Sequence, residues 1–175
     1  MAAGPRTRVP FRRRREGRTD YRARLGLLKS GETRLVVRHT NGNVVAQFVD
    51  WAENGDAVKA TAVGLELKGM GWEGSPKSTP AAYLTGLLAG KRAMEAGVED
   101  AVLDIGRRPP VRGSKVFAVL KGVLDAGVWV PHSDEILPSE DRLNGAFLDQ
   151  QTNFEAVQAA IGGAGAAKSD DEEDA

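Results

Sequence analysis

The densest group of chemically active side chains in the sequence is a run of arginines near the N-terminus. Arg12, Arg13, Arg14 and Arg15 are consecutive, and they are flanked by Arg6, Arg8, Arg18, Arg22 and Arg24. Guanidinium groups at this density repel one another in a free chain. RNA phosphates supply the anions that order them, with binding driven largely by counterion release. Phe11 and Tyr21 lie in the same segment and can stack on unpaired bases.

The run therefore predicts an RNA-binding arm. The alternatives are a solvated tail, a localisation signal and a lipid-binding patch. The lipid alternative is weak because the segment has no amphipathic apolar face.

A second basic segment follows a predicted strand and leads into a predicted helix. It contains Arg107, Arg108, Arg112 and Lys115. Two prolines stiffen it, which lowers the entropy lost when the arginines are held in place. Helix N-termini favour phosphate because their backbone N–H groups point outward. This segment is the second candidate RNA contact, and the alternative is a solvated loop that only forms a turn.

Catalytic and metal chemistry find little support in the sequence. The chain has no Cys and two His, which excludes cysteine-based zinc sites and thiol nucleophiles. Asp50 and Asp104 lie at predicted strand ends, where a metal-dependent nuclease could place carboxylates, but two aspartates alone are weak support. We predict no catalytic residue, no metal site and no cofactor, apart from Mg²⁺ or monovalent ions that accompany rRNA.

One glycine-rich stretch, Gly86–Arg92, superficially resembles part of a phosphate-binding loop. Its spacing is one residue short, no Ser or Thr follows Lys91, and it lies within a predicted helix. We expect its glycines to serve close helix packing instead.

The histidines and tryptophans carry weaker signals. His39 ends a predicted strand and is a candidate RNA contact, whereas His132 is expected to be an ordinary loop residue. Trp51, Trp72 and Trp129 are expected in the core or at its rim, although Trp72 lies in a glycine-rich loop from which it could reach RNA.

The formal net charge of zero conceals an asymmetry along the 175 residues. Residues 1–30 carry a net charge of +8 and the remainder carries −8, with an acidic run at 170–174. A basic arm on an acidic body is typical of nucleic-acid binders. No apolar run approaches the ~18 residues of a membrane span, and none follows the arginines as in a secretory signal. We therefore expect a cytoplasmic protein with no membrane partner.

Periodicity and turn residues indicate the elements that position these side chains. A helix is predicted to begin at Thr19 or Asp20 and to end at Gly31. Strands at 34–39 and 44–49 flank Asn41-Gly42, the strongest short signal for a hairpin. A third strand is expected at 57–62, where Val58, Ala60 and Ala62 alternate with polar residues. A helical turn is predicted at 64–70, followed by a helix at 79–96 capped by Thr79 and Gly97 and a strand at 101–105. A second long helix is predicted at 115–126, capped by Ser114 and Gly127. A last strand at 128–130 and weaker helical character at 139–161 complete the prediction.

This order predicts an α/β protein of the α+β type with a mixed sheet. An antiparallel hairpin and meander is followed by strand, helix, strand and helix, and the crossover implies a parallel strand pair. We expect an extended basic arm at 1–18, an α/β rRNA-binding domain at 19–138, a helical extension at 139–161 and a disordered acidic tail at 162–175.

Five segments form a set in a fixed order: RRRREGRTDYRAR at 12–24, RLVVR at 34–38, TPAAYLTGLL at 79–88, LDIG at 103–106 and GSKVFAVLKGVLDAG at 113–127. Together they resemble the archaeal-type members of the universal large-subunit ribosomal protein family that binds 5S rRNA, the eighteenth in the large-subunit series. The match runs to about residue 160. The resemblance implies a structural protein that docks 5S rRNA onto 23S rRNA in the central protuberance. It also implies contacts with neighbouring ribosomal proteins, including the other main 5S rRNA-binding protein.

The resemblance further implies RNA contacts from the arm, the first hairpin, the loop before the long helix and the second basic segment. The full predicted set is Arg6, Arg8, Phe11, Arg12, Arg13, Arg14, Arg15, Arg18, Tyr21, Arg22, Arg24, Arg38, His39, Asn41, Lys77, Ser78, Thr79, Arg107, Arg108, Arg112 and Lys115. The acidic body is similar to halophilic proteins, whose surface carboxylates maintain solubility in high salt. Two rival functions stay open: a metal-dependent nuclease, and an adaptor whose arm binds an acidic protein.

Overall fold

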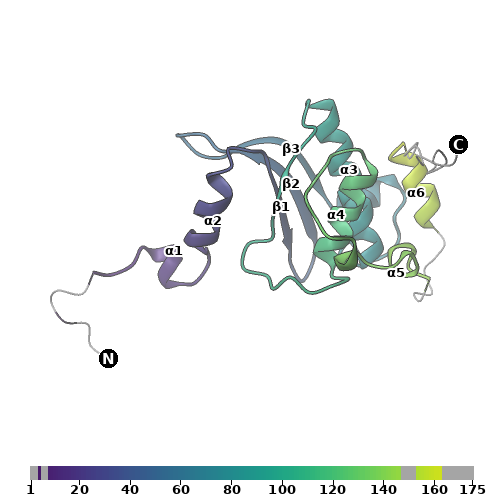
Figure 1. The fold of residues 1–175 in the computed structure, drawn as a ribbon. Helices are drawn as coiled ribbons and strands as arrows, with labels where there is room; N and C mark the ends of the chain where they lie inside the picture. Colours follow the sequence, from purple (N-terminus) through teal and green to yellow (C-terminus); the bar gives the residue numbers. More distant parts are fainter. Residues whose placement is uncertain (1–3, 5–7, 147–152, 163–175) are drawn as a thin grey trace, which may run out of the picture.

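Four strands form a mixed sheet in the order β3-β2-β1-β4. β1 (Arg34–His39), β2 (Val44–Asp50) and β3 (Ala57–Val63) are an antiparallel meander, and β4 (Val102–Asp104) pairs in parallel with β1. Two long helices, α3 (Thr79–Glu95) and α4 (Lys115–Asp125), cover one face of the sheet (Figure 1). This computed structural model, which describes residue 4, residues 8–146 and residues 153–162, confirms the predicted α+β fold class.

The shorter elements lie at the two ends of the chain and in its connections. They are α1 (Arg12–Arg15), α2 (Tyr21–Leu28), η1 (Glu66–Met70), η2 (Asp134–Ile136), α5 (Glu140–Asn144) and α6 (Phe154–Ala160). α1 and α2 project away from the sheet on the side opposite α3 and α4 (Figure 1). Of the helices that the structure describes, none is both long and apolar enough to cross a membrane.

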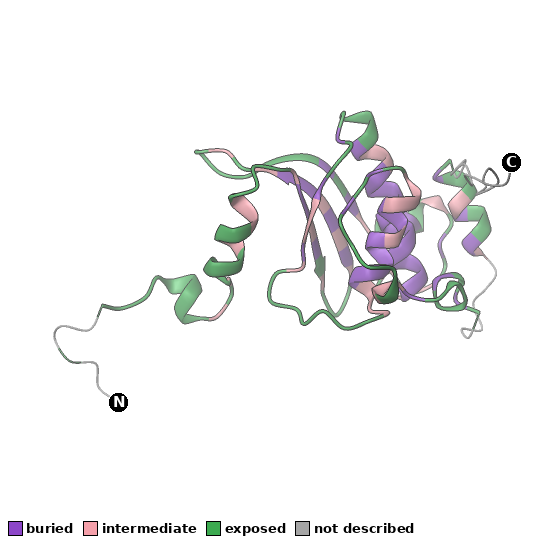
Figure 2. Cartoon of the chain, viewed as in Figure 1, coloured by how far each residue is buried: buried purple, intermediate pink, exposed green. Residues whose placement is uncertain are grey.

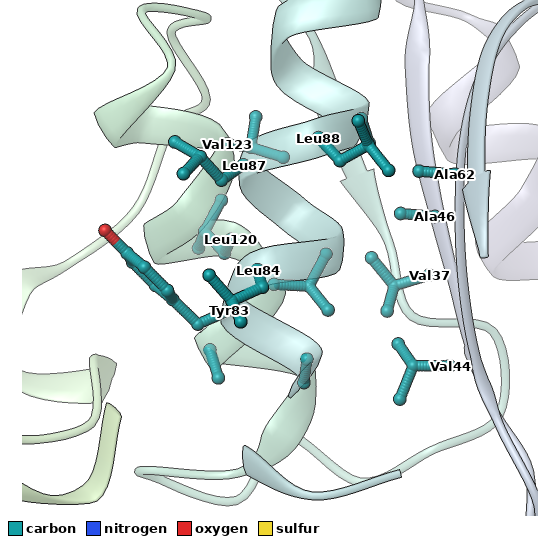
Figure 3. Close-up of a cluster of buried hydrophobic side chains, with 14 of the residues drawn as sticks. Val37, Val44, Ala46, Ala62, Tyr83, Leu84, Leu87, Leu88, Leu120 and Val123 are labelled. Atoms are coloured by element: carbon teal, nitrogen blue, oxygen red, sulfur yellow. The ribbon is translucent and has the colours of Figure 1, made fainter. Parts of the chain in front are cut away.

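The core lies between the sheet and the two long helices. Alternate residues of β1 and β2 point into it, because side chains alternate between the faces of a strand. Figure 3 shows Val37, Val44, Ala46 and Ala62 of the sheet facing Leu84 and Leu88 of α3, and all six are buried. Figure 2 shows that burial is concentrated in these layers, whereas α1 and α2 are exposed or half-buried.

The glycines of α3 and α4 allow the two helices to touch, which confirms the packing expected of Gly86. A Cβ at Gly86 would overlap the carbonyl oxygen of Val119, and one at Gly122 would overlap the carbonyl oxygen of Tyr83. Both neighbours are backbone atoms, so the helix axes approach more closely than larger residues permit.

The predicted hairpin is confirmed, but its turn is closed differently from the common Asn-Gly type. β1 and β2 pair from His39↔Val44 onward. Neither Asn41 nor Gly42 has positive φ. The Thr40 hydroxyl instead accepts the backbone N–H of Asn43 at 3.0 Å, so a side chain supplies the bond that a primed turn makes with its backbone.

Two predicted caps and one strand differ from the structure. Ser78, not Thr79, caps α3: its hydroxyl accepts the N–H of Ala81 at 3.3 Å. Ser114 occupies the N-cap position of α4, but its side chain makes no cap hydrogen bond. Residues 128–130 form only a single parallel bridge, Asp100↔Trp129, instead of a strand, and Pro131, which has no backbone N–H, cannot extend the pairing.

The tryptophans and the third strand also depart from expectation. Trp72 is buried, with its indole N–H donated to the Ser75 carbonyl at 3.4 Å, so it cannot reach RNA from this position. Trp51 and Trp129 are exposed at 60% and 59%, which places them outside the core. Val58 is likewise exposed, because the pairing of β2 with β3 shifts by one residue beside it.

The C-terminal extension packs against α3. The Phe154 ring of α6 lies 5.7 Å from the Tyr83 ring, centroid to centroid, and Val157 and Ile161 are buried. Lys91 of α3 donates a hydrogen bond to the Gly162 carbonyl. The predicted helical character at 139–161 thus corresponds to α5 and α6, whereas residues 147–152 and the expected acidic tail from 163 onward lie outside the described residues.

Candidate nucleic-acid interface

The arginine run is carried on two short helices that have no buried side chain. Residues 12–15 form one helical turn where extended chain was expected, and Glu16 stabilises it: its carboxylate lies 4.0 Å from Arg12 Nε and 2.9 Å from Arg18 Nε. Asp20 then caps α2, as predicted, by accepting the N–H groups of Arg22 and Ala23. Exposed ion pairs contribute little stability, so these guanidinium groups are free to exchange a carboxylate for a phosphate.

The arm and the second basic segment meet at one open hollow of about 910 Å³, which we call the arm hollow. Its basic lining residues come from three separate parts of the chain and are Arg13, Arg18, Arg24, Arg38, His39, Arg107 and Arg108. Gly17, at φ +64°, makes the turn between α1 and α2, and a Cβ there would collide with the Arg107 guanidinium. The arm therefore folds back against the loop that follows β4.

A chain of alternating charges, the ion chain, fixes the base of the arm to the sheet. It runs Arg24–Asp56–Arg34–Asp104–Arg38, with closest N–O distances of 2.9, 2.8, 3.2 and 3.0 Å in that order. Arg34 at its centre is 1% exposed. A buried charge is tolerated only when it is paired, so both carboxylates are needed to keep Arg34 inside.

The carboxylates proposed for a nuclease are occupied by these and similar contacts. Asp104 accepts from Arg34, from Arg38 and from the Gly106 backbone N–H. Asp50 lies 2.7 Å from Lys59 Nζ and 2.6 Å from the Thr33 hydroxyl. Among the described residues there is no group of three or more acidic or histidine side chains that could hold a metal ion. These contacts give the nuclease hypothesis no support, because both carboxylates are already engaged by cations and hydroxyl or backbone donors.

A second, smaller hollow of about 330 Å³ lies at the N-terminus of α4, and we call it the α4 hollow. Its polar lining includes His39, Thr79, Arg108, Ser114, Lys115 and Arg142. His39 and Arg108 line both hollows, so the two form one continuous basic surface running from the arm to α4.

Burial and nearby cations both shift pKa values in this surface. Burial, with smaller contributions from Lys115, Arg108 and Lys77, lowers the pKa of His39 below its ordinary value of 6.5. Burial and then Lys77 lower the pKa of Lys115. Both shifts have burial as their largest cause, with smaller contributions from neighbouring cations.

The remaining predicted contacts are distributed unevenly. Arg8, Phe11, Tyr21, Arg22 and Asn41 are exposed but line neither hollow, and Arg6 lies outside the described residues. Ser78 is engaged as the α3 cap. Arg112 lies 2.9 Å from Glu135 and also lines neither hollow.

Sequence reasoning missed two residues of the surface. Arg142 enters the α4 hollow from α5, about thirty positions after the loop that it meets, and no local pattern indicates that approach. Ser114 was recognised only as a helix cap, yet its hydroxyl oxygen is buried and has no hydrogen-bond partner among the described residues.

Comparison with known proteins gives a consistent answer. The model of a family described as "Ribosomal large subunit proteins 60S L5, and 50S L18" matches residues 5–100. Three relatives, each named "Large ribosomal subunit protein uL18", align over 148 residues, or 85% of this chain. The protein of Methanothermobacter thermautotrophicus is 55% identical to this chain, and 77% of its length is covered. The protein of Korarchaeum cryptofilum is 57% identical with 76% of its length covered, and the protein of Haloarcula marismortui is 55% identical with 79% of its length covered.

Proposed function

Since the chain belongs to the family of ribosomal large subunit proteins 60S L5 and 50S L18, and is a structural protein of the large subunit and not an enzyme, we propose that it binds 5S rRNA. In this proposal it helps to dock 5S rRNA onto 23S rRNA in the central protuberance, beside neighbouring ribosomal proteins that include the other main 5S rRNA-binding protein. Residues 1–18 serve as the RNA-binding arm, 19–138 as the rRNA-binding domain and 139–161 as its helical extension.

The observation that carries the proposal is the meeting of the arm, the end of β1 and the Arg107–Arg108 loop at the arm hollow. Three segments distant in sequence present guanidinium groups to one concave surface. Such a surface suits a folded RNA, in which several phosphates lie close together, better than it suits a single acidic peptide. Phe11 on the arm, 80% exposed, and Tyr21 at the start of α2, 41% exposed, are available to stack on unpaired bases.

The test is a salt series of binding to 5S rRNA with tRNA as a control of similar size. The variant replaces Arg12, Arg13, Arg14 and Arg15 with Gln, a change that removes exposed charges and no core contact. The matched control replaces Lys29, Lys59, Lys68 and Lys121 with Gln, which removes the same charge from other parts of the surface. Each lost phosphate contact should reduce the slope of log K against log salt by ~0.7–0.9.

Tighter binding of 5S rRNA than tRNA by the wild type, with a slope reduced by roughly 3 in the arginine variant only, supports the proposal. Equal binding of the two RNAs, or equal effects of the two variants, means that the arm supplies only generic charge. A wild type that binds neither RNA would instead favour the protein adaptor, whose partner is acidic.

A further inference from the structure

We infer that the α4 hollow is a binding site for one backbone phosphate of the RNA, built jointly by β1, the loop before α4 and α5 of the C-terminal extension. The inference rests on the proposed function, because it names the group that this part of the surface receives. It adds Ser114 and Arg142 to the interface, and it gives the extension beyond residue 138 a direct part in RNA binding.

The cations around this hollow are unpaired. Arg108, Lys115 and Arg142 line it, Lys77 lies near enough to His39 and Lys115 to perturb both, and no carboxylate is among the lining residues. None of these basic side chains forms an ion pair with any described residue, and Arg108 makes only a hydrogen bond, at 3.0 Å, to the His39 carbonyl. By contrast, Arg112 in the same loop is paired with Glu135. Like charges converging from four chain segments are unfavourable unless an anion joins them.

Ser114 supplies an independent observation. Its hydroxyl is buried at the α4 hollow yet has no hydrogen-bond partner among the described residues, and it does not cap the helix whose N-cap position it occupies. A buried hydroxyl without a partner is costly. With the Ser114 side chain turned toward the hollow, its hydroxyl would donate a hydrogen bond to a phosphate oxygen, which would also lie at the positive end of α4.

The size and walls of the hollow are consistent with a phosphate within a chain. A hollow of about 330 Å³ is larger than one phosphate group, and Pro109 and Val111 form an apolar side to it. The adjoining ribose can rest there while the phosphate lies against Ser114 and Lys115. A phosphate in this place is also close to Arg108, which lines the arm hollow too, so the RNA backbone can continue from one hollow to the other.

Two variants test the site, and both keep the core intact. Arg142→Gln removes an exposed cation that has no ion pair, and it should weaken binding to 5S rRNA roughly two- to fivefold. Ser114→Asp places a carboxylate where the phosphate is proposed to lie, and it should weaken binding at least ~10-fold through repulsion. Asp is a favoured N-cap residue and would meet the unpaired cations, so the melting temperature of Ser114→Asp should not fall. A merely structural role for Ser114 would not combine these two results.

The matched control is Lys59→Gln, which removes one charge at the opposite end of the sheet, where Lys59 pairs with Asp50. Interference by phosphate ethylation then identifies the RNA group. One ethylated position should weaken the wild type but not Ser114→Asp, and 5S rRNA without its 5′-terminal phosphate should behave like the intact RNA.

The outcomes separate the two levels of inference. If the wild type selects 5S rRNA but both variants bind like Lys59→Gln, the phosphate site is wrong and the proposed function stands. If the two variants no longer weaken binding once the 5′-terminal phosphate is removed from the RNA, the site binds the RNA terminus, and the assignment to a backbone phosphate is wrong. If the wild type does not prefer 5S rRNA to tRNA, the proposed function itself fails.

Discussion

Replacing Gly86 with Ala should destabilise the protein, although alanine is the better helix former. The added Cβ would overlap the Val119 carbonyl oxygen and would lie 2.8 Å from the Val119 carbonyl carbon and 2.9 Å from its Cα. These are backbone atoms of α4 and cannot rotate away, so α3 and α4 must separate. Overpacking of this kind costs ~1–3 kcal/mol or more, and the helix-propensity gain of about 1 kcal/mol offsets part of it. We expect an overpacking cost at the upper end of this range, about 3 kcal/mol, and therefore a net loss of about 2 kcal/mol once the propensity gain is subtracted.

Urea unfolding followed by circular dichroism measures this change. The matched control is Gly26→Ala in the exposed helix α2, where a Cβ would meet nothing within 4 Å and should leave the midpoint unchanged or higher. Gly122→Ala, whose Cβ would overlap the Tyr83 carbonyl oxygen, tests the same contact from α4. Because one separation of the helices relieves both overlaps, the double variant should lose less than the sum of the single losses. A midpoint for Gly86→Ala at or above that of Gly26→Ala would refute the reasoning.

Four further results are expected. The pKa of His39 lies below 6.5 because of burial and the nearby Lys115, Arg108 and Lys77, and a bound RNA phosphate would raise this pKa. Affinity for 5S rRNA, measured by fluorescence anisotropy, should therefore rise as the pH falls from about 7.5 to about 6. The variant His39→Gln should remove this rise in affinity. In the free protein the sign is opposite: the unfolded state binds this proton more tightly, so unfolding free energy should fall as the pH drops below 6.5. Asp104→Asn leaves the buried Arg34 without one of its carboxylates and should cost ~3–5 kcal/mol in urea unfolding. Phe154→Ala removes the buried ring beside Tyr83, so limited proteolysis should release a C-terminal fragment faster, while the melting temperature of the remaining domain changes little.

The expectations for RNA affinity, for Asp104→Asn and for Phe154→Ala each have a contrary outcome. Affinity that is independent of pH, or that falls on acidification, would mean that His39 does not face phosphate. An Asp104→Asn variant as stable as the wild type would mean that Asp56 alone satisfies Arg34. Proteolysis at the wild-type rate in Phe154→Ala would mean that Val157 and Ile161 hold α6 in place without the ring.

Local signals predicted much of the fold, and contacts between distant segments explain the rest. The hairpin at Asn41-Gly42, the Asp20 cap and the Gly97 helix end depend on neighbouring residues only, and all three are confirmed. The N-cap of α3 is Ser78, one residue before the predicted Thr79. Both Ser and Thr are favoured at this position, so only the path of the chain decides which of them caps the helix.

The candidate site was harder to predict in its geometry. The arginine run and the Arg107–Arg108 loop are visible in the sequence, but their meeting depends on the turn at Gly17 and on the parallel pairing of β1 with β4. In the sequence, Arg34 is indistinguishable from any other residue of a strand. Its burial requires the carboxylates of Asp56 and Asp104, which are 22 and 70 positions away. Arg142 contributes through the packing of α5, for which the sequence gives no local sign.

The ion chain also bears on how the protein tolerates concentrated electrolyte. At about 1 M salt the Debye length is ~3 Å, so the exposed contacts between arm and RNA are strongly attenuated. Arg34 and Asp104, at 1% and 6% exposed, are shielded from mobile ions by the protein around them. This buried pair should therefore persist at high salt, whereas the Arg24–Asp56 contact that joins α2 to the ion chain involves side chains that are 36% and 28% exposed and should weaken. At high salt the arm would therefore be less firmly oriented before it meets RNA, and ordering it on contact would cost more entropy.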